Sequence, residues 1–240
     1  MVSNVVEGLG EGGAVYVAIL APQGKYLFDF LLVADGADVL IDTAADRAEA
    51  LAKRLKMYCL RRDASLAPEP GLSVVLLWGE GTAPAGAVAD PREPALGWRM
   101  LTSEPEAALA GAEPATRADY DALRVAHGVP ESGVELVPED TFILEAGFER
   151  LHGVDFRKGC YVGQEVTARM KHKTELKKRL VRVSVEGGAA PGTPVETEEG
   201  KPAGTLFTQA SGAGLAHLRL DRARAGGLRA GDARVSLAEE

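Results

Sequence analysis

Cys160 differs from the other cysteine in its neighbours, which are of the types that a working thiol needs. The segment around it reads Arg-Lys-Gly-Cys-Tyr-Val-Gly-Gln-Glu. Two cations within three residues favour the thiolate, which is the reactive form of cysteine. Gly159 and Gly163 permit an unusual turn or a close approach of the backbone to a ligand, and Gln164 and Glu165 could orient a polar ligand or a proton. The segment predicts a functional thiol, with an inert buried cysteine as the alternative.

The other candidate motifs are better explained as structure. Residues 8–13 match the dinucleotide-binding pattern Gly-x-Gly-x-x-Gly, but they precede an expected strand and contain an acid, so we interpret them as a turn. The four histidines lack the spacing of metal ligands, and the two cysteines form no Cys-x-x-Cys pair. We expect no metal site and no disulfide, and we interpret Cys59 as a small apolar residue at a helix end. No Ser-His-Asp or Cys-His arrangement supports nucleophilic hydrolysis.

The chain is acidic, but its charge is uneven. Its 240 residues carry a formal net charge of −8, which argues against nucleic acid or an anionic membrane as a direct partner. Residues 157–182, in contrast, contain nine Lys or Arg and two acids. Part of this stretch could bind a small polyanion such as a polyglutamate tail, or it could be a solvated connector. The residues concerned are Arg169, Lys171, Lys173, Lys177, Lys178 and Arg179.

The composition is typical of a globular protein, with 46% hydrophobic and 26% charged residues. No window approaches the ~18 continuous apolar residues that cross a bilayer. The first residues lack the basic and apolar pattern of a signal peptide. We therefore expect a cytoplasmic protein with free thiols and no membrane partner.

The elements that must position the thiol are mixed in the first part of the chain. Strands are predicted at 14–20, 26–33 and 39–41, the first two as a hairpin. Asp42-Thr43 is expected to cap a helix with apolar residues on one face, namely Ala48, Leu51, Ala52, Leu55 and Tyr58. A buried strand at 73–78 and a short one at 98–101 follow. A further helix is predicted from Thr116, capped by Asp119, to Gly128.

Beyond Lys177 the pattern changes to short alternating strands separated by Pro-Gly and Gly-Gly turns. These strands, around 181–185, 204–208, 214–219 and 233–237, predict a small antiparallel barrel. The fold class is therefore α+β, with a body at 1–175 and a C-terminal antiparallel β-barrel at 176–240. We expect two subdomains in the body, the second at roughly 63–115.

Residues 158–165, Lys-Gly-Cys-Tyr-Val-Gly-Gln-Glu, resemble the signature of the YgfZ family. Members of that family are folate-binding relatives of the glycine-cleavage T-protein that serve iron–sulfur cluster assembly or repair. The similarity continues at residues 20–30, 58–62, 90–92, 96–99 and 123–130. It implies a multi-part ring with a terminal β-barrel around a central tetrahydrofolate pocket. It also implies iron–sulfur client or assembly proteins as partners, and support of tRNA modification.

The resemblance also implies site residues. Residues 142–147 resemble the T-protein segment whose glutamate grips the pterin, and a carboxylate can accept two parallel N–H bonds, so Glu145 is the expected folate contact. T-proteins carry two adjacent aspartates in the hairpin, where this chain has Asp29-Phe30. The difference argues against aminomethyl transfer, although Asp29 remains an expected folate contact. Cys160 is the functional thiol, and the other expected cofactor-binding residues are Lys158, Gly159, Tyr161, Gly163, Gln164, Glu165 and Arg169.

Three functions stay open at this point. The first is a tetrahydrofolate-binding accessory protein for iron–sulfur cluster assembly or repair, in which Glu145, Asp29 and residues 158–165 line one cavity. The second is a folate-dependent aminomethyl or one-carbon transferase, and the third is a protein-interaction module that uses the basic residues. Residues 2–5 resemble a family segment that ordinarily follows a first strand and helix, so we expect the sequence to begin inside a longer chain.

Overall fold

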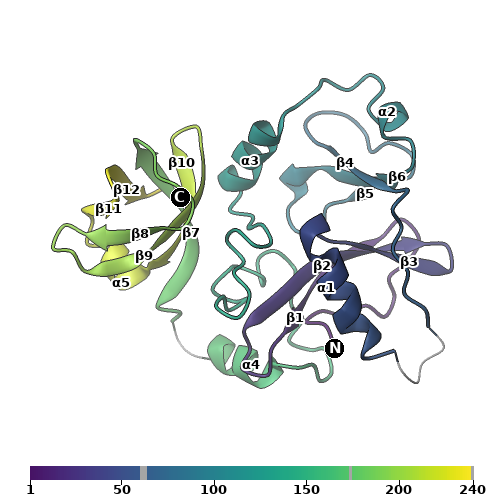
Figure 1. Ribbon diagram of the computed structural model, residues 1–240, viewed down its shortest axis with the longest axis horizontal. Helices are drawn as coiled ribbons and strands as arrows, with labels where there is room; N and C mark the ends of the chain where they lie inside the picture. Colours follow the sequence, from purple (N-terminus) through teal and green to yellow (C-terminus); the bar gives the residue numbers. More distant parts are fainter. Residues whose placement is uncertain (60–63, 173–174, 239–240) are drawn as a thin grey trace.

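Two three-stranded sheets and a closed six-stranded barrel make up most of the regular structure (Figure 1). The computed structural model describes residues 1–59, 64–172 and 175–238. Residues 60–62 of the family resemblance, the first residue of the expected subdomain at 63–115, and Lys173 of the basic set lie outside the described residues. Among the helices of the described ranges, none is long and apolar enough to cross a membrane.

The first sheet has the order β1-β2-β3. Its strands are β1 (Ala14–Leu20), β2 (Tyr26–Asp35) and β3 (Asp38–Asp42), as the sequence predicted to within two residues at each end. Because side chains alternate along a strand, β1 is buried on both faces. Tyr16 and Ala18 face the main core, and Val17 and Ile19 face a second core that contains residues of helix α1 (Ala45–Lys56).

The start of α1 differs from the prediction. Ala44 is the N-cap, and no side chain caps the helix. Asp42 remains in β3, where its carboxylate forms a buried ion pair with Arg99, while the Thr43 hydroxyl donates to the backbone carbonyl of Asp29 at 3.2 Å. Tyr58, expected on the apolar face of the helix, lies beyond the helix end and is 47% exposed. Asp42, which the local sequence pattern predicted as part of the helix cap, is therefore held in β3 by Arg99.

The second sheet has the order β4-β6-β5, and two short helices flank it. Its elements are β4 (Ser73–Leu77), β5 (Val88–Ala89), η1 (Pro94–Leu96), β6 (Trp98–Thr102) and α2 (Pro105–Ala108). The prediction that the first of these strands is buried is wrong, because only Val75 is buried and Val74 is exposed. The strand lies at the edge of the sheet, where no strand of the described residues pairs with its outer side.

A buried network of charges joins the two sheets. Asp90 accepts hydrogen bonds from Arg92 and from Arg99, and Arg99 also pairs with Asp42 of β3. Burial acts to raise the pKa of Asp90, but the hydrogen bonds and charges of the two arginines outweigh it and hold the pKa at about 2. The two sheets are therefore connected by ionised side chains that satisfy one another.

Helix α3 (Arg117–Ala126) begins with the predicted capping box between Thr116 and Asp119. After α3, residues 127–163 run mainly as turns and loops, and then α4 (Gln164–His172) begins. This loop stretch is partly buried, because its residues Leu136, Ile143 and Phe148 belong to the main core. It lies between the first sheet and the barrel (Figure 1).

The C-terminal barrel is closed and antiparallel, as predicted, with the strand order β10-β7-β12-β11-β8-β9. Its elements are β7 (Lys178–Glu186), β8 (Thr193–Thr197), β9 (Pro202–Ala210), β10 (Ala213–Arg219), α5 (Leu220–Ala223), β11 (Leu228–Ala230) and β12 (Ala233–Leu237). β8 and β11 were not predicted, because they are short and follow proline or glycine turns. The barrel encloses a separate core. The divisions at 1–175, 63–115 and 176–240 stay predictions.

Arg124 connects the body to the barrel. Its side chain is buried and donates to the Glu135 carboxylate at 3.0 Å and to the Thr208 hydroxyl of β9 at 2.5 Å. Glu135 in turn accepts from the Thr208 backbone N–H at 3.1 Å. A buried ion pair that also hydrogen-bonds the neighbouring domain fixes the position of β9 against α3.

Candidate functional site

Cys160 is exposed, on a short loop between a buried segment and helix α4. The next residue, Tyr161, anchors the loop because its side chain is buried in the main core. On the helix side, the Gln164 amide donates to the backbone carbonyl of Lys158 at 3.4 Å. The loop therefore presents the thiol to solvent from a support that is fixed at both ends.

Gly163 is the tightest point of this support. It has φ +83°, and a Cβ there would come within 2.7 Å of the carbonyl oxygen of Ala21 in the β1–β2 hairpin. A Cβ on Gly159, in contrast, would meet nothing within 4 Å. The sequence predicted that both glycines permit close approach, but space requires a glycine only at Gly163.

Glu165 and Arg169 form an ion pair with each other on the exposed face of α4. The distance from the Arg169 guanidinium to Glu165 Oε1 is 2.7 Å, and both side chains are largely exposed. Such an i,i+4 pair stabilises a helix by about 0.3–0.5 kcal/mol. In the described part of the chain, Glu165 and Arg169 thus stabilise their own helix. Their expected role in cofactor binding stays a prediction.

Glu145 lies at the junction of the body and the barrel. Its backbone carbonyl accepts from the Leu180 N–H of β7 at 2.7 Å, and its carboxylate faces His217 of β10, with 3.9 Å between Oε2 and Nε2. Burial raises the pKa of Glu145, while the charges of Lys178 and Lys25 act to lower it. The carboxylate is therefore partly desolvated, which suits recognition of a ligand with N–H donors.

Lys25 places the hairpin beside the Glu145 segment. Its ammonium donates to the backbone carbonyl of Asp140 and lies over the Phe142 ring, 3.6 Å from the ring centroid. The next residue, Tyr26, donates its N–H to the Thr141 carbonyl at 2.8 Å. The β1–β2 hairpin thus contacts the segment before Glu145 through backbone and side chain.

Asp29 is buried on β2 and is surrounded by hydroxyl groups. Its carboxylate accepts from the Tyr26 hydroxyl at 2.6 Å, from the Tyr16 hydroxyl at 2.9 Å, and from the Ser132 hydroxyl. Burial, followed by the negative charge of Asp29, raises the pKa of both tyrosines, so they remain protonated donors. In the structure Asp29 therefore joins the sheet to the loop that contains Ser132.

The hairpin is the element that the three predicted sites share. Asp29 lies on it, Lys25 beside its turn faces the Glu145 segment, and the turn itself contacts Gly163 of the thiol segment. No hydrogen bond or ion pair within the described ranges joins Asp29, Glu145 and Cys160 directly. The expected cavity that all three line stays a prediction.

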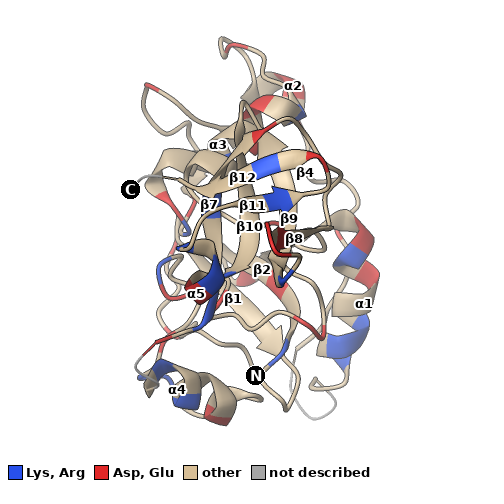
Figure 2. Ribbon diagram, turned by 90° about the vertical axis from the view of Figure 1, so that its left-hand side faces the viewer, with Lys and Arg blue, Asp and Glu red and all other residues tan. Residues whose placement is uncertain are grey.

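The basic residues lie on different surfaces. Figure 2 shows Lys and Arg close together on α4, and a second set of cations at the C-terminal end of α1. On α4, Lys171 pairs with Glu149 and its ammonium lies 5.4 Å from the Phe156 ring centroid. Of the basic residues predicted to bind a polyanion, Lys178 is the one whose charge acts to lower the pKa of Glu145 in the described structure. The predicted polyanion-binding strip is therefore divided between a helix and the start of the barrel.

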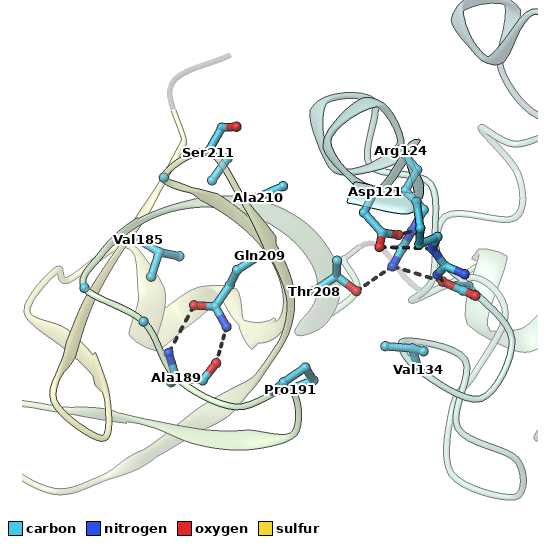
Figure 3. A pocket seen from close by; sticks show the side chains of 16 residues that line it. Asp121, Arg124, Val134, Val185, Ala189, Pro191, Thr208, Gln209, Ala210 and Ser211 are labelled. Atoms are coloured by element: carbon cyan, nitrogen blue, oxygen red, sulfur yellow. Dashed lines mark hydrogen bonds and ion pairs between the residues drawn. The ribbon is translucent and has the colours of Figure 1, made fainter. Parts of the chain in front are cut away.

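A cleft of about 570 Å³ lies between α3 and the rim of the barrel, away from the predicted residues (Figure 3). Arg117, Asp121 and Arg124 line its helix side, and the glycine-rich turns at 187–188 and 211–212 line its barrel side. The side chains of Asp121 and Arg124 are already paired at 2.7 Å. A second hollow, of about 370 Å³, lies beside the residues that precede the thiol, including His152 and Phe156.

His217 is the residue near the site that the sequence analysis missed. From the sequence, the histidines were considered chiefly as metal ligands, and the described residues hold no group of three or more His, Cys, Asp or Glu that could bind a metal. A signal was present in the strand pattern. Ala216 and Leu218 point into the barrel core, so His217 must point outwards, toward the body that buries it.

Comparison with known proteins gives three findings. Residues 177–240 match the family described as the CAF17 C-terminal beta-barrel domain. The chain is similar to the mitochondrial iron–sulfur cluster assembly factor IBA57 of Mus musculus, with 34% identity over 86% of this chain and 65% of the relative. The human IBA57 protein is 32% identical over 85% of this chain and 64% of that protein. The chain thus spans slightly less than two thirds of the length of these relatives.

The fold is that of the glycine-cleavage T-proteins. The glycine cleavage system aminomethyltransferase T of Bartonella henselae matches 99% of this chain and 78% of its own chain, with a TM-score of 0.70 and 13% identity. This likeness confirms the predicted α+β fold class with its T-protein-like arrangement and terminal barrel. It concerns the fold alone.

One prediction is overturned by these relatives. The absence of a signal pattern predicted a cytoplasmic protein, whereas the IBA57 proteins are named as mitochondrial. The prediction of a cytoplasmic location is therefore wrong. It relied on the first residues of the sequence, which carry no such information when a chain matches only part of its relatives.

Proposed function

We propose that this protein, whose chain is similar to CAF17 and IBA57 proteins and has a T-protein-like fold, is an accessory factor that assembles or repairs iron–sulfur clusters in other proteins. The observation that carries this proposal is the exposed thiol of Cys160 on a fixed loop. The cluster is cargo in this function, and the client or assembly proteins are the partners. The resemblance of residues 158–165 to the YgfZ signature supports the same role.

The support around the thiol fits such a task. A thiol that meets a cluster or a partner's sulfur must be accessible, and it must be held so that little entropy is lost on contact. Cys160 is exposed, while Tyr161 next to it is buried and Gly163 is packed against the hairpin. Cys59 also is a free thiol, but it is half-buried and contacts the Leu55 carbonyl at 3.5 Å. The two cysteines are therefore a natural pair of test and control.

Tetrahydrofolate is the ligand that we propose for the junction of body and barrel. Glu145 provides a partly buried carboxylate with two lysines nearby, which matches a ligand that combines N–H donors with a negatively charged tail. Asp29 contributes by fixing the Ser132 loop to the sheet. Folate binding at this junction would fix the position of the barrel relative to the body.

The test uses cells that lack the protein and depend on it for iron–sulfur enzyme activity. Cys160→Ser should leave the fold and the affinity for tetrahydrofolate unchanged and abolish the rescue of that enzyme activity, whereas Cys59→Ser should rescue fully. Circular dichroism and calorimetry on the purified variants establish fold and affinity. Full rescue by Cys160→Ser would remove the thiol from the proposed function.

A further inference from the structure

Three basic side chains lie together where helix α3 ends, and they come from three segments of the chain. His127 is the C-cap of α3, Arg150 belongs to the loop stretch that follows, and Arg182 lies on β7 of the barrel. Both arginines are exposed, and His127 is partly exposed. This α3-end cluster therefore lies at the surface of the junction between body and barrel, where α3 runs beside the barrel (Figure 1).

Backbone carbonyls at the end of α3 hold both guanidinium groups in place. Nη1 of Arg182 donates to the Ala126 carbonyl at 2.8 Å, and Nη2 of Arg150 donates to the Gly128 carbonyl at 2.7 Å. Gly128 has φ +63°, and a Cβ there would lie 3.2 Å from Arg150 Nη2 and 3.9 Å from Arg182 Cγ. The two side chains thus pass over the same glycine. Because each guanidinium has five N–H donors, both keep donors for a further partner.

The positive charge of the cluster is not balanced. Among the described residues, Glu93 is the one carboxylate within 4 Å of these groups, at 3.5 Å from Arg150 Nη1 and 3.9 Å from His127 Nδ1. The same carboxylate also accepts from the Ala95 N–H at 3.4 Å. These distances are long for charge-assisted hydrogen bonds. Two permanent positive charges therefore share one loosely held carboxylate, and the carbonyl end of the helix offsets only part of the excess.

The electrostatics of Arg150 agree with this geometry. Burial lowers the pKa of Arg150, and the charge of Arg182 lowers it further, although Glu93 acts to raise it. Arginine nevertheless keeps its proton in proteins, so two like charges stay close together at this position. An anion between them would remove the repulsion.

We propose that the α3-end cluster binds a phosphoryl group. Such a group carries close to two negative charges and three acceptor oxygens, which match two arginines and a neighbouring imidazole. Guanidinium groups donate to phosphate oxygens in pairs, and the carbonyls of α3 already fix the position of both groups. The inference goes beyond cluster assembly and is independent of folate binding.

A ligand at this position would contact the body and the barrel at the same time. Arg150 and His127 belong to the body, and Arg182 belongs to the barrel. Because a ligand that binds only the folded protein stabilises it by mass action, phosphate should raise the melting temperature. The phosphoryl group can come from a small molecule or from a phosphorylated partner protein, whereas the net charge of −8 disfavours nucleic acid.

The experiment measures calorimetric affinity and thermal unfolding of the full chain with inorganic phosphate. A short peptide with one phosphoserine and no other charged side chain is the second probe, and acetate at the same ionic strength is the carboxylate control. Phosphate should bind and raise the melting temperature, and acetate should do neither. Binding of the phosphopeptide tighter than that of phosphate would identify a partner protein as the source, and weaker binding would identify a small molecule.

The variants test the cluster itself. Arg150→Met and Arg182→Met should each weaken phosphate binding about tenfold or more, the value of one hydrogen bond to a charged group. Glu93→Gln should strengthen it roughly threefold, because a negative charge beside the anion is removed. Arg234→Met is the matched control and should change nothing. Arg234 is exposed on β12 and likewise has one long ion pair, 3.9 Å from Glu186.

Each result decides the proposal. Unchanged phosphate affinity in Arg150→Met and Arg182→Met, or a response to phosphate no larger than that to acetate, would overturn it, and the basic residues would then serve only to cap α3. Circular dichroism checks that the variants fold. If Arg150→Met does not fold, Arg150→Lys takes its place, and it should weaken binding less than Arg182→Met because it keeps the charge and loses only the paired donors.

Discussion

Gly24, in the turn of the β1–β2 hairpin, lies directly against Val166 of helix α4. A Cβ on Gly24 would stand 2.8 Å from the Val166 Cβ, which is closer than carbon atoms approach. Gly163, just before α4, reaches the same turn from the other side, with 3.1 Å between its own would-be Cβ and the Gly24 Cα. The thiol loop and the hairpin that contains Asp29 are therefore fitted together through two glycines.

Gly163→Ala should destabilise the protein and displace the thiol loop. The residue has φ +83°, a conformation that costs an alanine about 1–2 kcal/mol, and its Cβ would collide with the Ala21 carbonyl as well. We expect a loss of at least 2 kcal/mol in the free energy of unfolding, measured by urea titration. Gly159→Ala, in the same loop but with open space around it, should stay within about 0.5 kcal/mol. Similar losses in the two variants would contradict the fit.

Arg124→Met should loosen the barrel from the body. The substitution leaves the buried Glu135 carboxylate without its cation, and loss of one partner of a buried ion pair costs about 3–5 kcal/mol. It also removes the hydrogen bond to Thr208 of β9. Arg117→Met, whose side chain is 63% exposed, is the matched control and should change stability by less than about 1 kcal/mol. Hydrogen exchange should report faster exchange in β9 only for the first variant.

Phe30→Asp should unfold the protein rather than create an aminomethyltransferase. Phe30 is buried against Leu51 and Leu55 of α1, on the opposite face of β2 from Asp29. Loss of a large core side chain costs about 3–5 kcal/mol, and an unpaired buried carboxylate adds to that. Phe30→Leu should cost about 1 kcal/mol. A folded Phe30→Asp variant with aminomethyl transfer to tetrahydrofolate would reverse this conclusion and restore the transferase as the function.

The sequence was informative where the signal is local. The capping box of α3 joins residues three positions apart, and the barrel strands alternate within a few residues. The start of α1 was misjudged because the partner of Asp42 is Arg99, 57 positions away. Helix α4 was not predicted at all, because its basic residues suggested a connector, and its first turn depends on contact with the hairpin. His217 was missed for a similar reason, since only the tertiary structure shows what covers it.

The stability of the protein should fall in mildly acidic solution, and His217 should be the cause. Its pKa is lowered from 6.5 to about 4 in the folded protein, first by burial. In the unfolded chain the ring binds a proton below about pH 6.5, so the unfolded state takes up more protons than the folded state between pH 6.5 and 4. Above pH 6.5 the protonation of His217 therefore does not reduce the free energy of unfolding. As the pH falls towards 4, this free energy decreases by up to about 3 kcal/mol.

Asp90 acts in a lower range, whereas Glu145, whose pKa is raised by burial, takes up its proton in the folded state and so acts against the His217 effect. The pKa of Asp90 is about 2 against an ordinary 3.8, so its contribution is lost only as the pH falls below about 4. Urea unfolding between pH 4 and 7.5 should give a slope for the wild-type protein that His217→Phe removes. His172→Phe, at the exposed end of α4, should leave the slope in place. A slope that persists in His217→Phe would mean that another group takes up the proton, and would remove the buried neutral histidine from the explanation.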